Sequence, residues 1–299
     1  MATHAEIEET FNYMDEIFRA SFGEHADLTC ALFDGDFGKS LEQAQRDKHR
    51  LILDGLRVGP GSRVLDVGCG WGPLLVAIRE RGAHGVGITL STRQHETCLR
   101  GQLESHLMDW HDVTRETFGG FDAIAAVGSM EHFCSPAEYE AGQQDRVYER
   151  FFEMCDSLLT SGGRVYVQSM VWGANVPQYA DISLDAPPDS NEYMTAMLGE
   201  FYPGAFGAFG AEHYVRCASR WFTEVYRSDG RLDYIETMNR WGAFEDWNPR
   251  TLWMAAKLLW PYVSDPKFRR KVAALRASNN RECFRREILT LCRLIFEKS

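Results

Sequence analysis

The sequence lacks the close cysteine and histidine spacings that hold structural metal ions. Its 299 residues include eight cysteines, scattered with no Cys-x-x-Cys pair, and its nine histidines form no cluster with them. Structural zinc sites need pairs of ligands a few residues apart. We therefore expect no metal, and we expect free thiols, as in a reducing compartment such as the cytoplasm.

The chain also lacks an excess of positive charge and any long apolar run. Its formal net charge of −11 disfavours binding to the phosphate backbone of nucleic acids and gives no general attraction to anionic membrane surfaces. The charged N-terminus has no apolar core typical of a signal peptide, and no run approaches a membrane span. We therefore expect a cytoplasmic protein with no transmembrane segment and no nucleic-acid partner.

Residues 63–72, Arg-Val-Leu-Asp-Val-Gly-Cys-Gly-Trp-Gly, are the most informative stretch. They predict a buried strand, a glycine turn and then a helix from Pro73. Such a turn lets backbone approach a ligand, the helix N-terminus offers free N–H groups, and Asp66 can face the ligand. The Gly-x-Gly-x-Gly spacing is not that of dinucleotide sites, and no acidic residue ends the next strand. We therefore expect a nucleoside-type ligand rather than a nicotinamide.

Short apolar runs alternate with helical stretches through the middle of the chain. The expected strands are 63–67, 85–89, 105–108, 121–127 and 163–169, and the expected helices are 41–56, 73–81, 92–100 and 145–159. The alternation predicts an α/β fold with a doubly wound, mostly parallel sheet that binds ligands at the carboxyl ends of its strands. The expected units are an N-terminal helical cap and active-site segment (1–60), the cofactor-binding core (61–172), an aromatic-rich lid (173–225), and the end of the core with C-terminal helices (226–299).

Four further segments are interpreted from their spacing. Residues 4–22 predict a helix with one apolar face, which either packs on the core or caps the cofactor. The helix at 145–159 is expected to end in a glycine cap at 161–163. The tail is expected to be helical, with apolar residues between Cys283 and Phe296 on one helix. The basic run at 267–271 predicts a solvated helix face, contact with an anionic lipid or phosphorylated substrate being the alternative.

Five segments in the first half of the chain form one sequence pattern. They are Asp66-Val67-Gly68-Cys69-Gly70-Trp71-Gly72, Ala31-Leu32-Phe33 with Ser40-Leu41-Glu42-Gln43-Ala44-Gln45, Gly87-Ile88-Thr89-Leu90-Ser91-x-x-Gln94, Asp109-Trp110, and Val127-Gly128-x-x-Glu131-His132-Phe133. Together they resemble the cyclopropane fatty acid synthase and mycolic acid methyltransferase family of S-adenosylmethionine-dependent methyltransferases. The resemblance implies a Rossmann-like fold, S-adenosyl-L-methionine as cofactor and S-adenosyl-L-homocysteine as product.

By this resemblance, residues at the ends of several strands would contact the cofactor. Thr89 and Gln94 would bind ribose hydroxyls in place of the usual acidic residue. Trp110 would stack on adenine, and the alternative is an ordinary core tryptophan. The chain between Gln94 and Trp110 is shorter than the family pattern, which bears on the adenine pocket. The expected cofactor contacts are Thr29, Asp66, Gly68, Gly70, Gly72, Thr89, Leu90, Gln94, Asp109 and Trp110.

The leading catalytic candidate is Glu131, after the fourth strand. A carboxylate among apolar side chains there could stabilise a passing cation or take its proton, while a structural interaction with a helix N-terminus is the alternative. His132 accompanies Glu131, and in related amine-methylating enzymes the same pair would act on an amine.

In the family's cyclopropane synthases, a bound bicarbonate takes the proton. It is held around a cysteine backbone, a glutamate, a histidine and a tyrosine. Cys30 and Glu131 match the first two, Gln168 stands at the histidine position, and the tyrosine region near Trp241 offers no clear counterpart. Bicarbonate therefore stays an open alternative, and the expected catalytic residues are Glu131, His132, Cys30 and Gln168.

Aromatic residues interleaved with glycine and proline between 171 and 220 favour a lid or pocket wall, with a satellite core as the alternative. The expected substrate pocket consists of Tyr179, Tyr193, Met197, Phe201, Phe206 and Trp241. We expect methyl transfer to carbon or nitrogen of a hydrophobic small molecule or lipid-derived acceptor. The alternatives are cyclopropane or methyl-branch synthesis on an acyl-chain double bond, and a subunit that binds cofactor without chemistry. The sequence does not determine the oligomeric state, for which a homodimer is one alternative.

Overall fold

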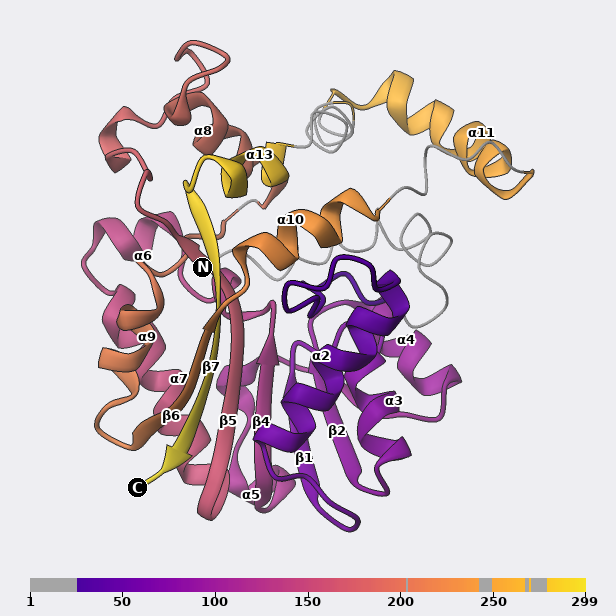
Figure 1. Cartoon of the computed structure of the whole chain (residues 1–299), viewed down its shortest axis with the longest axis vertical. Helices are drawn as coiled ribbons and strands as arrows, with labels where there is room; N and C mark the ends of the chain where they lie inside the picture. Colours follow the sequence, from indigo (N-terminus) through magenta and orange to yellow (C-terminus); the bar gives the residue numbers. More distant parts are fainter. Residues whose placement is uncertain (1–25, 203, 242–248, 267–268, 270–278) are drawn as a thin grey trace.

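The computed structural model describes residues 26–202, 204–241, 249–266, 269 and 279–299. Within them, a seven-stranded sheet in the order β3-β2-β1-β4-β5-β7-β6 is covered by helices on both faces (Figure 1). The strands are β1 Arg63–Val67, β2 His84–Thr89, β3 Glu104–Leu107, β4 Phe121–Val127, β5 Leu159–Trp172, β6 Phe222–Asp229 and β7 Leu289–Lys298. The expected α/β fold with a doubly wound, mostly parallel sheet is confirmed.

The helices alternate with the first five strands, and several of the later helices lie above the upper end of the sheet as drawn in Figure 1. They are α2 Leu41–Gly55, α3 Pro73–Glu80, α4 Thr92–Arg100, α5 Arg115–Phe118, α6 Pro136–Glu140, α7 Gln144–Leu158, α8 Asn191–Phe201, α9 Ala211–Ala218, α10 Arg231–Asn239, α11 Pro249–Ser264 and α13 Asn279–Arg285, with the 3-10 helices η1 Trp110–Asp112, η2 Met130–His132 and η3 Tyr179–Asp181. The helix expected at 4–22 lies outside the described residues. No described helix is long and apolar enough to cross a membrane.

The parallel strands bring the predicted motifs to one edge of the sheet. β1 pairs in parallel with β2 and β4, so that Val67 lies beside Ile88 and Ala126. The segments that follow these three strands therefore meet at the same end of the sheet, which is where open α/β sheets bind ligands. This is the position of the glycine turn, of Thr89 and of Glu131.

The end of the chain differs from the prediction. The helix expected between Cys283 and Phe296 is wrong, because α13 ends at Arg285 and β7 runs antiparallel between β5 and β6. Most of β7 is buried, since helices cover both faces of the sheet. A strand buried on both faces has apolar residues at odd and even positions, and its pattern is then easily mistaken for that of a buried helix.

The expected glycine cap of α7 is also wrong. The helix ends at Leu158, and Leu159 is already extended, with φ −73° and ψ 143°. Residues 161–163 lie inside β5, where Gly162 has a positive φ of 72° and the register with β4 shifts. These glycines therefore form an irregular start of a strand, because glycine permits bulges as readily as helix caps.

Residues 173–225 divide between two layers. Helix α9 packs on α7, and its Tyr214 and Cys217 belong to the main core. Helix α8 instead contacts α13 above the end of the sheet (Figure 1). There a smaller apolar cluster, which we call the upper cluster, includes Cys30, Met170, Leu198, Tyr234, Cys283, Phe284, Ile288, Leu289 and Leu291.

Candidate active site

The turn after β1 is the place where a ligand can approach the backbone. Gly68, Gly70 and Gly72 have φ values of 82°, 55° and 83°, which other residues rarely adopt. A Cβ on Gly68 would lie 2.6 Å from the Cβ of Ser129, and one on Gly72 would lie 2.6 Å from Leu103 Cδ1. A Cβ on Gly70 would meet no described atom within 4 Å. Gly70 therefore borders open space next to the N-terminus of α3.

Two buried polar side chains lie near this turn. The Ser129 hydroxyl has no hydrogen-bond partner among the described residues. Burial, and then the nearby Asp27, raise the pKa of Asp66 to about 7. A buried hydroxyl without a partner and a desolvated carboxyl are costly in the absence of a ligand. They suit a ligand that brings hydrogen-bonding groups and positive charge.

The residues expected at the ribose lie together at the end of β2. Thr89 Oγ1 donates to Gln94 Oε1 at 2.7 Å and accepts from the N–H of Ser91 at 3.2 Å. Both Thr89 and Gln94 are buried, and Leu90 between them is partly buried. The hydroxyl and the amide are thus already oriented toward each other by the short turn into α4.

Asp109 and Trp110 behave differently from each other. Asp109 Oδ1 accepts from the N–H of His111 at 2.9 Å, so the carboxylate caps η1 at the surface. The Trp110 ring is buried in the main core, stacked on His111 at 3.7 Å and beside Phe133 at 5.0 Å. These contacts favour the core-tryptophan interpretation of Trp110 over the adenine plate.

Glu131 lies in η2, directly after β4, and is 7% exposed. Its Oε2 accepts from Ser169 Oγ at 3.0 Å. Burial raises the pKa of Glu131 to about 7, although backbone N–H groups and Ser169 act in the opposite direction. A Cβ on Gly128 would stand 3.7 Å from Glu131 Oε1 and 3.0 Å from Thr29 Cγ2. Glycine at position 128 therefore lets the Thr29 segment and the carboxyl approach from two sides.

The environment of Glu131 contains neutral groups. Burial lowers the pKa of His132 to about 4, and the His132 ring meets the Tyr202 ring edge-on at 5.8 Å. Burial, and then Glu131, raise the pKa of Tyr202. The pKa of Tyr234 is raised by burial and also by Tyr202 and Glu131. Glu131 therefore interacts electrostatically with both tyrosines.

Sequence reasoning assigned neither Tyr202 nor Tyr234 to the site. It searched for a tyrosine near Trp241, whereas Tyr234 lies about two helical turns earlier, in α10, within the upper cluster that also contains Cys30. The spacing of Tyr234, Thr237 and Trp241 is that of one helix face. It could have indicated the tyrosine, since Thr237 Oγ1 accepts the N–H of Ala31 beside Cys30 at 3.0 Å.

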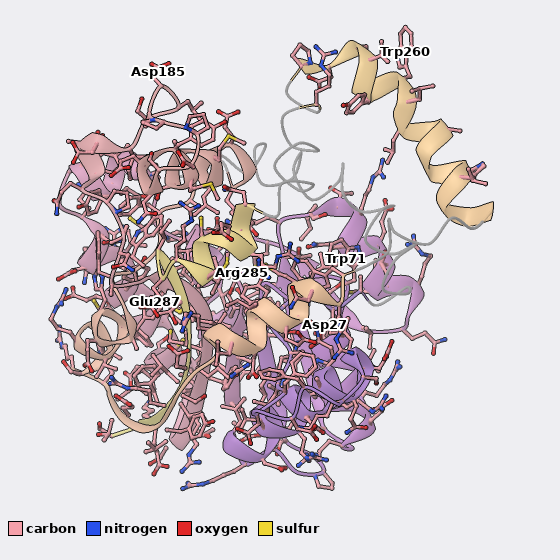
Figure 2. All side chains as sticks on the ribbon, turned by 45° about the horizontal axis from the view of Figure 1, so that its top comes forward. Asp27, Trp71, Asp185, Trp260, Arg285 and Glu287 are labelled. Atoms are coloured by element: carbon pink, nitrogen blue, oxygen red, sulfur yellow. The ribbon has the colours of Figure 1, made fainter. Side chains whose placement is uncertain are left out.

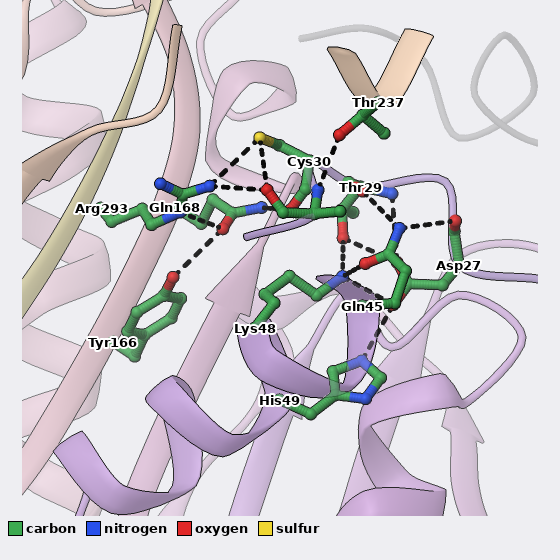
Figure 3. A network of polar contacts seen from close by, with 11 residues as sticks. Asp27, Thr29, Cys30, Gln45, Lys48, His49, Tyr166, Gln168, Thr237 and Arg293 are labelled. Atoms are coloured by element: carbon green, nitrogen blue, oxygen red, sulfur yellow. Dashed lines mark hydrogen bonds and ion pairs between the residues drawn. The ribbon is translucent and has the colours of Figure 1, made fainter. Parts of the chain in front are cut away.

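Gln168 is held by three bonds (Figure 3). Its Nε2 donates to the Cys30 carbonyl at 3.2 Å, and its Oε1 accepts from Tyr166 Oη at 3.1 Å and from Arg293 Nε at 3.2 Å. Consecutive strand residues point to opposite faces, so Gln168 points away from the side on which its neighbour Ser169 reaches Glu131. The predicted catalytic group of Cys30, Glu131 and Gln168 is therefore divided between two faces of β5.

The cation beside Cys30 is Arg293 of β7, which is 1% exposed. Its Nη2 donates to the Ala31 carbonyl at 2.9 Å and lies 3.3 Å from Cys30 Sγ and 3.0 Å from Asp233 Oδ2. Burial opposes the charge, but Cys30, Tyr166 and Asp233 raise the pKa of Arg293 above its usual range. Arg293 was missed because its strand was interpreted as a helix.

A second buried cation holds the residue before Cys30. Lys48 Nζ lies 2.6 Å from Asp27 Oδ2 and 2.7 Å from Thr29 Oγ1 (Figure 3). Burial opposes ionisation of Asp27, but Lys48 and His49 hold its pKa well below the usual range. The Thr29 hydroxyl is engaged in this network, so Thr29 presents its methyl group to Gly128.

The expected pocket residues fall into separate groups. Trp241 packs on the upper cluster with Cys30 and Tyr234. Phe206 stacks on Tyr139 at 4.1 Å and meets Tyr179 edge-on at 5.5 Å, as part of another aromatic cluster. On α8, two further pocket candidates are partly buried, and the side chain of the third lies outside the described residues; these are Tyr193, Met197 and Phe201.

The structure also brings together a group that the sequence did not predict. Ligand atoms of Asp145, His213 and Cys217 all lie within 4.8 Å of one another. Both imidazole nitrogens of His213 are already engaged, one with Asp145 at 2.7 Å and the other with the N–H of Phe209 at 3.2 Å. Arg216 binds both Asp145 oxygens. These bonds join α7 to α9 and give the group a structural role.

Residues 2–245 match the family model described as mycolic acid cyclopropane synthetase. The chain belongs to this family. It is similar to cyclopropane mycolic acid synthase 2 of Mycobacterium leprae (strain TN), with 29% identity over 248 residues that cover 79% of this chain and 78% of the relative. As a family member, the chain is an S-adenosylmethionine-dependent methyltransferase, and its cofactor is S-adenosyl-L-methionine.

Two solved structures show the same fold. Mycolic acid cyclopropane synthase CmaA1, complexed with SAH and CTAB, has a TM-score of 0.76 and 22% identity, covering 99% of this chain and 98% of its own. Coclaurine N-methyltransferase, bound to N-methylheliamine and SAH, has a TM-score of 0.72 and 15% identity, covering 98% of this chain and 82% of its own. The methyltransferase fold is therefore common to carbon and nitrogen methylation.

The residues at the glycine turn fit this cofactor. The open space at Gly70, the unpartnered Ser129 hydroxyl and the desolvated Asp66 carboxyl lie near the turn. When bound, S-adenosyl-L-methionine supplies an electrophilic methyl group on a positively charged sulfonium. Asp66 would favour a cation by charge, and the Thr89–Gln94 pair offers ribose partners.

We expect Arg293→Met to destabilise this methyltransferase by about 3–5 kcal/mol, because it leaves Asp233 buried without its cation. Urea unfolding measures the loss. Asp233→Asn added to Arg293→Met should recover part of it, since the uncompensated charge is then removed. Arg227→Met, which breaks more exposed ion pairs with Glu224 and Glu212, is the matched control and should cost about 1 kcal/mol or less. Equal losses in the two single variants would contradict the importance of the buried pair.

Proposed function

We propose that this methyltransferase acts on a double bond in the acyl chain of a lipid-derived acceptor and forms a cyclopropane or methyl-branched product. The observation that carries the proposal is Glu131, a buried carboxyl whose pKa of about 7 lets it exist in both protonation states near neutral pH. It faces Gly128, just after β4 and beside the glycine turn. Support also comes from relatives named for mycolic acids, including hydroxymycolate synthase MmaA4 of Mycobacterium tuberculosis, which is 27% identical over 254 residues.

The role of Glu131 follows from the charge of the acceptor. Transfer of the methyl group that the cofactor would supply consumes the π electrons of the double bond, releases S-adenosyl-L-homocysteine as the neutral leaving group, and places the positive charge on the neighbouring carbon. The ionised Glu131 stabilises this charge and accepts a proton from the added methyl group. The electron pair of that C–H bond then closes the ring, so charge and atoms balance.

The two tyrosines near Glu131 do not compete with it for the proton. Tyr202 and Tyr234 stay protonated because burial raises the pKa of both. The apolar residues of the upper cluster exclude water, which would otherwise add to the cation as a nucleophile. In this proposal the proton acceptor is Glu131 itself, and a bound bicarbonate is the alternative acceptor.

The second candidate is methylation of an amine nitrogen. It is favoured by the low pKa of His132, about 4, which leaves a neutral imidazole beside Glu131 at pH 7. An amine acceptor must be unprotonated before it attacks a methyl group, and the Glu131 carboxylate, with a pKa of about 7, can take that proton while the neutral His132 adds no competing positive charge.

The test supplies the protein with S-adenosyl-L-methionine and three acceptors in parallel: a phospholipid with cis-monounsaturated chains, its saturated counterpart, and a hydrophobic secondary amine. We expect only the unsaturated lipid to gain one methylene unit by mass spectrometry. Proton NMR then distinguishes a cyclopropane ring from a methyl branch. A methylated amine with unchanged lipids would overturn the proposal in favour of the second candidate.

A further inference from the structure

Helix α11 carries an apolar face that points to solvent. It projects from the body of the protein (Figure 1), and Trp260 lies on its outer side (Figure 2). Trp260 is 75% exposed, and Trp253 and Leu259 are each 61% exposed. Large side chains of this kind are usually buried, so their exposure on one helix needs an explanation.

The exposed residues share one side of the helix. They are Leu252, Trp253, Ala256, Leu259, Trp260 and Val263. Their spacing of three, four and seven residues places them in a single stripe, at about 3.6 residues per turn. A surface helix normally turns such a stripe toward the core. In α11 the stripe is directed away from it.

The same part of the chain is locally basic. Between residues 249 and 271 the sequence has one acidic residue, Asp265, and six basic residues, namely Arg250, Lys257, Lys267, Arg269, Arg270 and Lys271. The whole chain, in contrast, carries a net charge of −11. The segment is therefore a positive, tryptophan-bearing region in an acidic protein.

We propose that α11 binds in the plane of an anionic lipid bilayer. Its apolar stripe enters the boundary between headgroups and acyl chains, where tryptophan and leucine are favoured. The basic residues that the sequence contains between 249 and 271 are attracted to lipid phosphates. With 16 residues, α11 is shorter than the roughly 20 apolar residues that span a bilayer, so it lies on the membrane.

A second copy of the chain is a poorer match for the same face. A symmetric dimer through α11 would place two basic segments against each other, and like charges at an interface are unfavourable. An anionic lipid surface complements both the charge and the apolar stripe. Because α11 projects outward (Figure 2), the stripe can meet a flat surface.

The inference goes beyond the proposed function and is tested without cofactor or acceptor. The full chain is sedimented with vesicles of phosphatidylcholine alone, or of equal parts phosphatidylcholine and phosphatidylglycerol. We expect binding to the anionic vesicles and weaker binding at high salt. The double variant Trp253→Ser with Trp260→Ser should bind about tenfold more weakly or worse, because both indoles leave the contact.

The matched control changes two exposed apolar residues elsewhere. Leu184→Ser with Leu232→Ser removes side chains that are 47% and 57% exposed, and it should leave vesicle binding unchanged. Thermal unfolding checks that both double variants fold as the wild type does. Equal binding of the tryptophan variant and the wild type would overturn the proposal. Failure of the wild type to bind anionic vesicles would also overturn the proposal. In that case, a dimer or a complex with an acidic protein that depends on the two tryptophans would identify the true partner of this helix face.

Discussion

Glu131→Gln should lower turnover by about 10²–10⁴-fold while S-adenosyl-L-homocysteine still binds with unchanged affinity. The amide keeps the size of the carboxyl and can still accept the hydrogen bond from Ser169, but it can neither carry negative charge nor accept the proton. Calorimetric titration measures binding, and transfer of a labelled methyl group measures turnover. Glu153→Gln, exposed on α7, is the control and should be fully active.

The same carboxyl gives wild-type activity a pH dependence. The ionised form is the active one, so turnover should rise as the pH passes through about 7, the raised pKa of Glu131. Full activity of Glu131→Gln, or a flat wild-type profile between pH 6 and pH 8, for which about a tenfold rise is expected from one ionisation, would remove Glu131 from the chemistry.

Glu131 also affects the free energy of unfolding, and the direction of its pKa shift determines how that free energy changes with pH. Its pKa rises from an ordinary value of 4.5 to about 7 on folding. The stabilisation linked to its proton is complete below pH 4.5 and is lost as the pH rises through about 7. At pH 8 Glu131→Gln should therefore be more stable than the wild type, by up to about 3 kcal/mol, and the difference should disappear in acid.

Gly70→Val should weaken cofactor binding by about 100-fold or more, which corresponds to about 3 kcal/mol. Gly70 has a φ of 55° and borders open space in the glycine turn, so a valine there would fill the space that the ligand needs. The positive φ at this position also disfavours a β-branched residue, so the valine should lower the stability of the fold through backbone strain as well.

Gly142→Val separates these two effects. Gly142 has a φ of 67°, and a Cβ there would also meet no described atom within 4 Å. The strain should therefore be similar in both variants, and their melting temperatures should fall by similar amounts. Only Gly70→Val should lose affinity in the calorimeter. Equal affinities of the two variants would show that the space at Gly70 does not hold the cofactor.

Local signals were enough to predict the first half of the sheet. β1, β2 and β4 are short apolar runs, each followed by a turn, and their expected bounds are confirmed to within one residue. β7 carries no such signal, because it is buried on both faces and follows α13 after a short turn. β6 was not predicted either; among the described strands it lies at the edge of the sheet and pairs with β7.

The candidate site, like the sheet, could be predicted only where the sequence carries a local signal. Glu131 and Gly70 could be identified because the motif around each is contiguous in sequence. The surroundings of Cys30 could not, because its contact with Arg293 joins residues 263 positions apart. The bonds of Gln168 and the core position of Trp110 likewise depend on packing that sequence spacing does not encode. The roles of all these residues stay predictions.

The place of β7 in the sheet also determines when the protein can become active during its synthesis. β6 leaves the ribosome before β7 exists, so the strand that pairs with it in the described sheet is still missing, and so is Arg293, the described partner of Asp233. The sheet and the support for the Cys30 segment are completed together, once residues 289–298 are free. A nascent chain stopped before Leu289 should therefore be inactive even though its whole cofactor turn has been made.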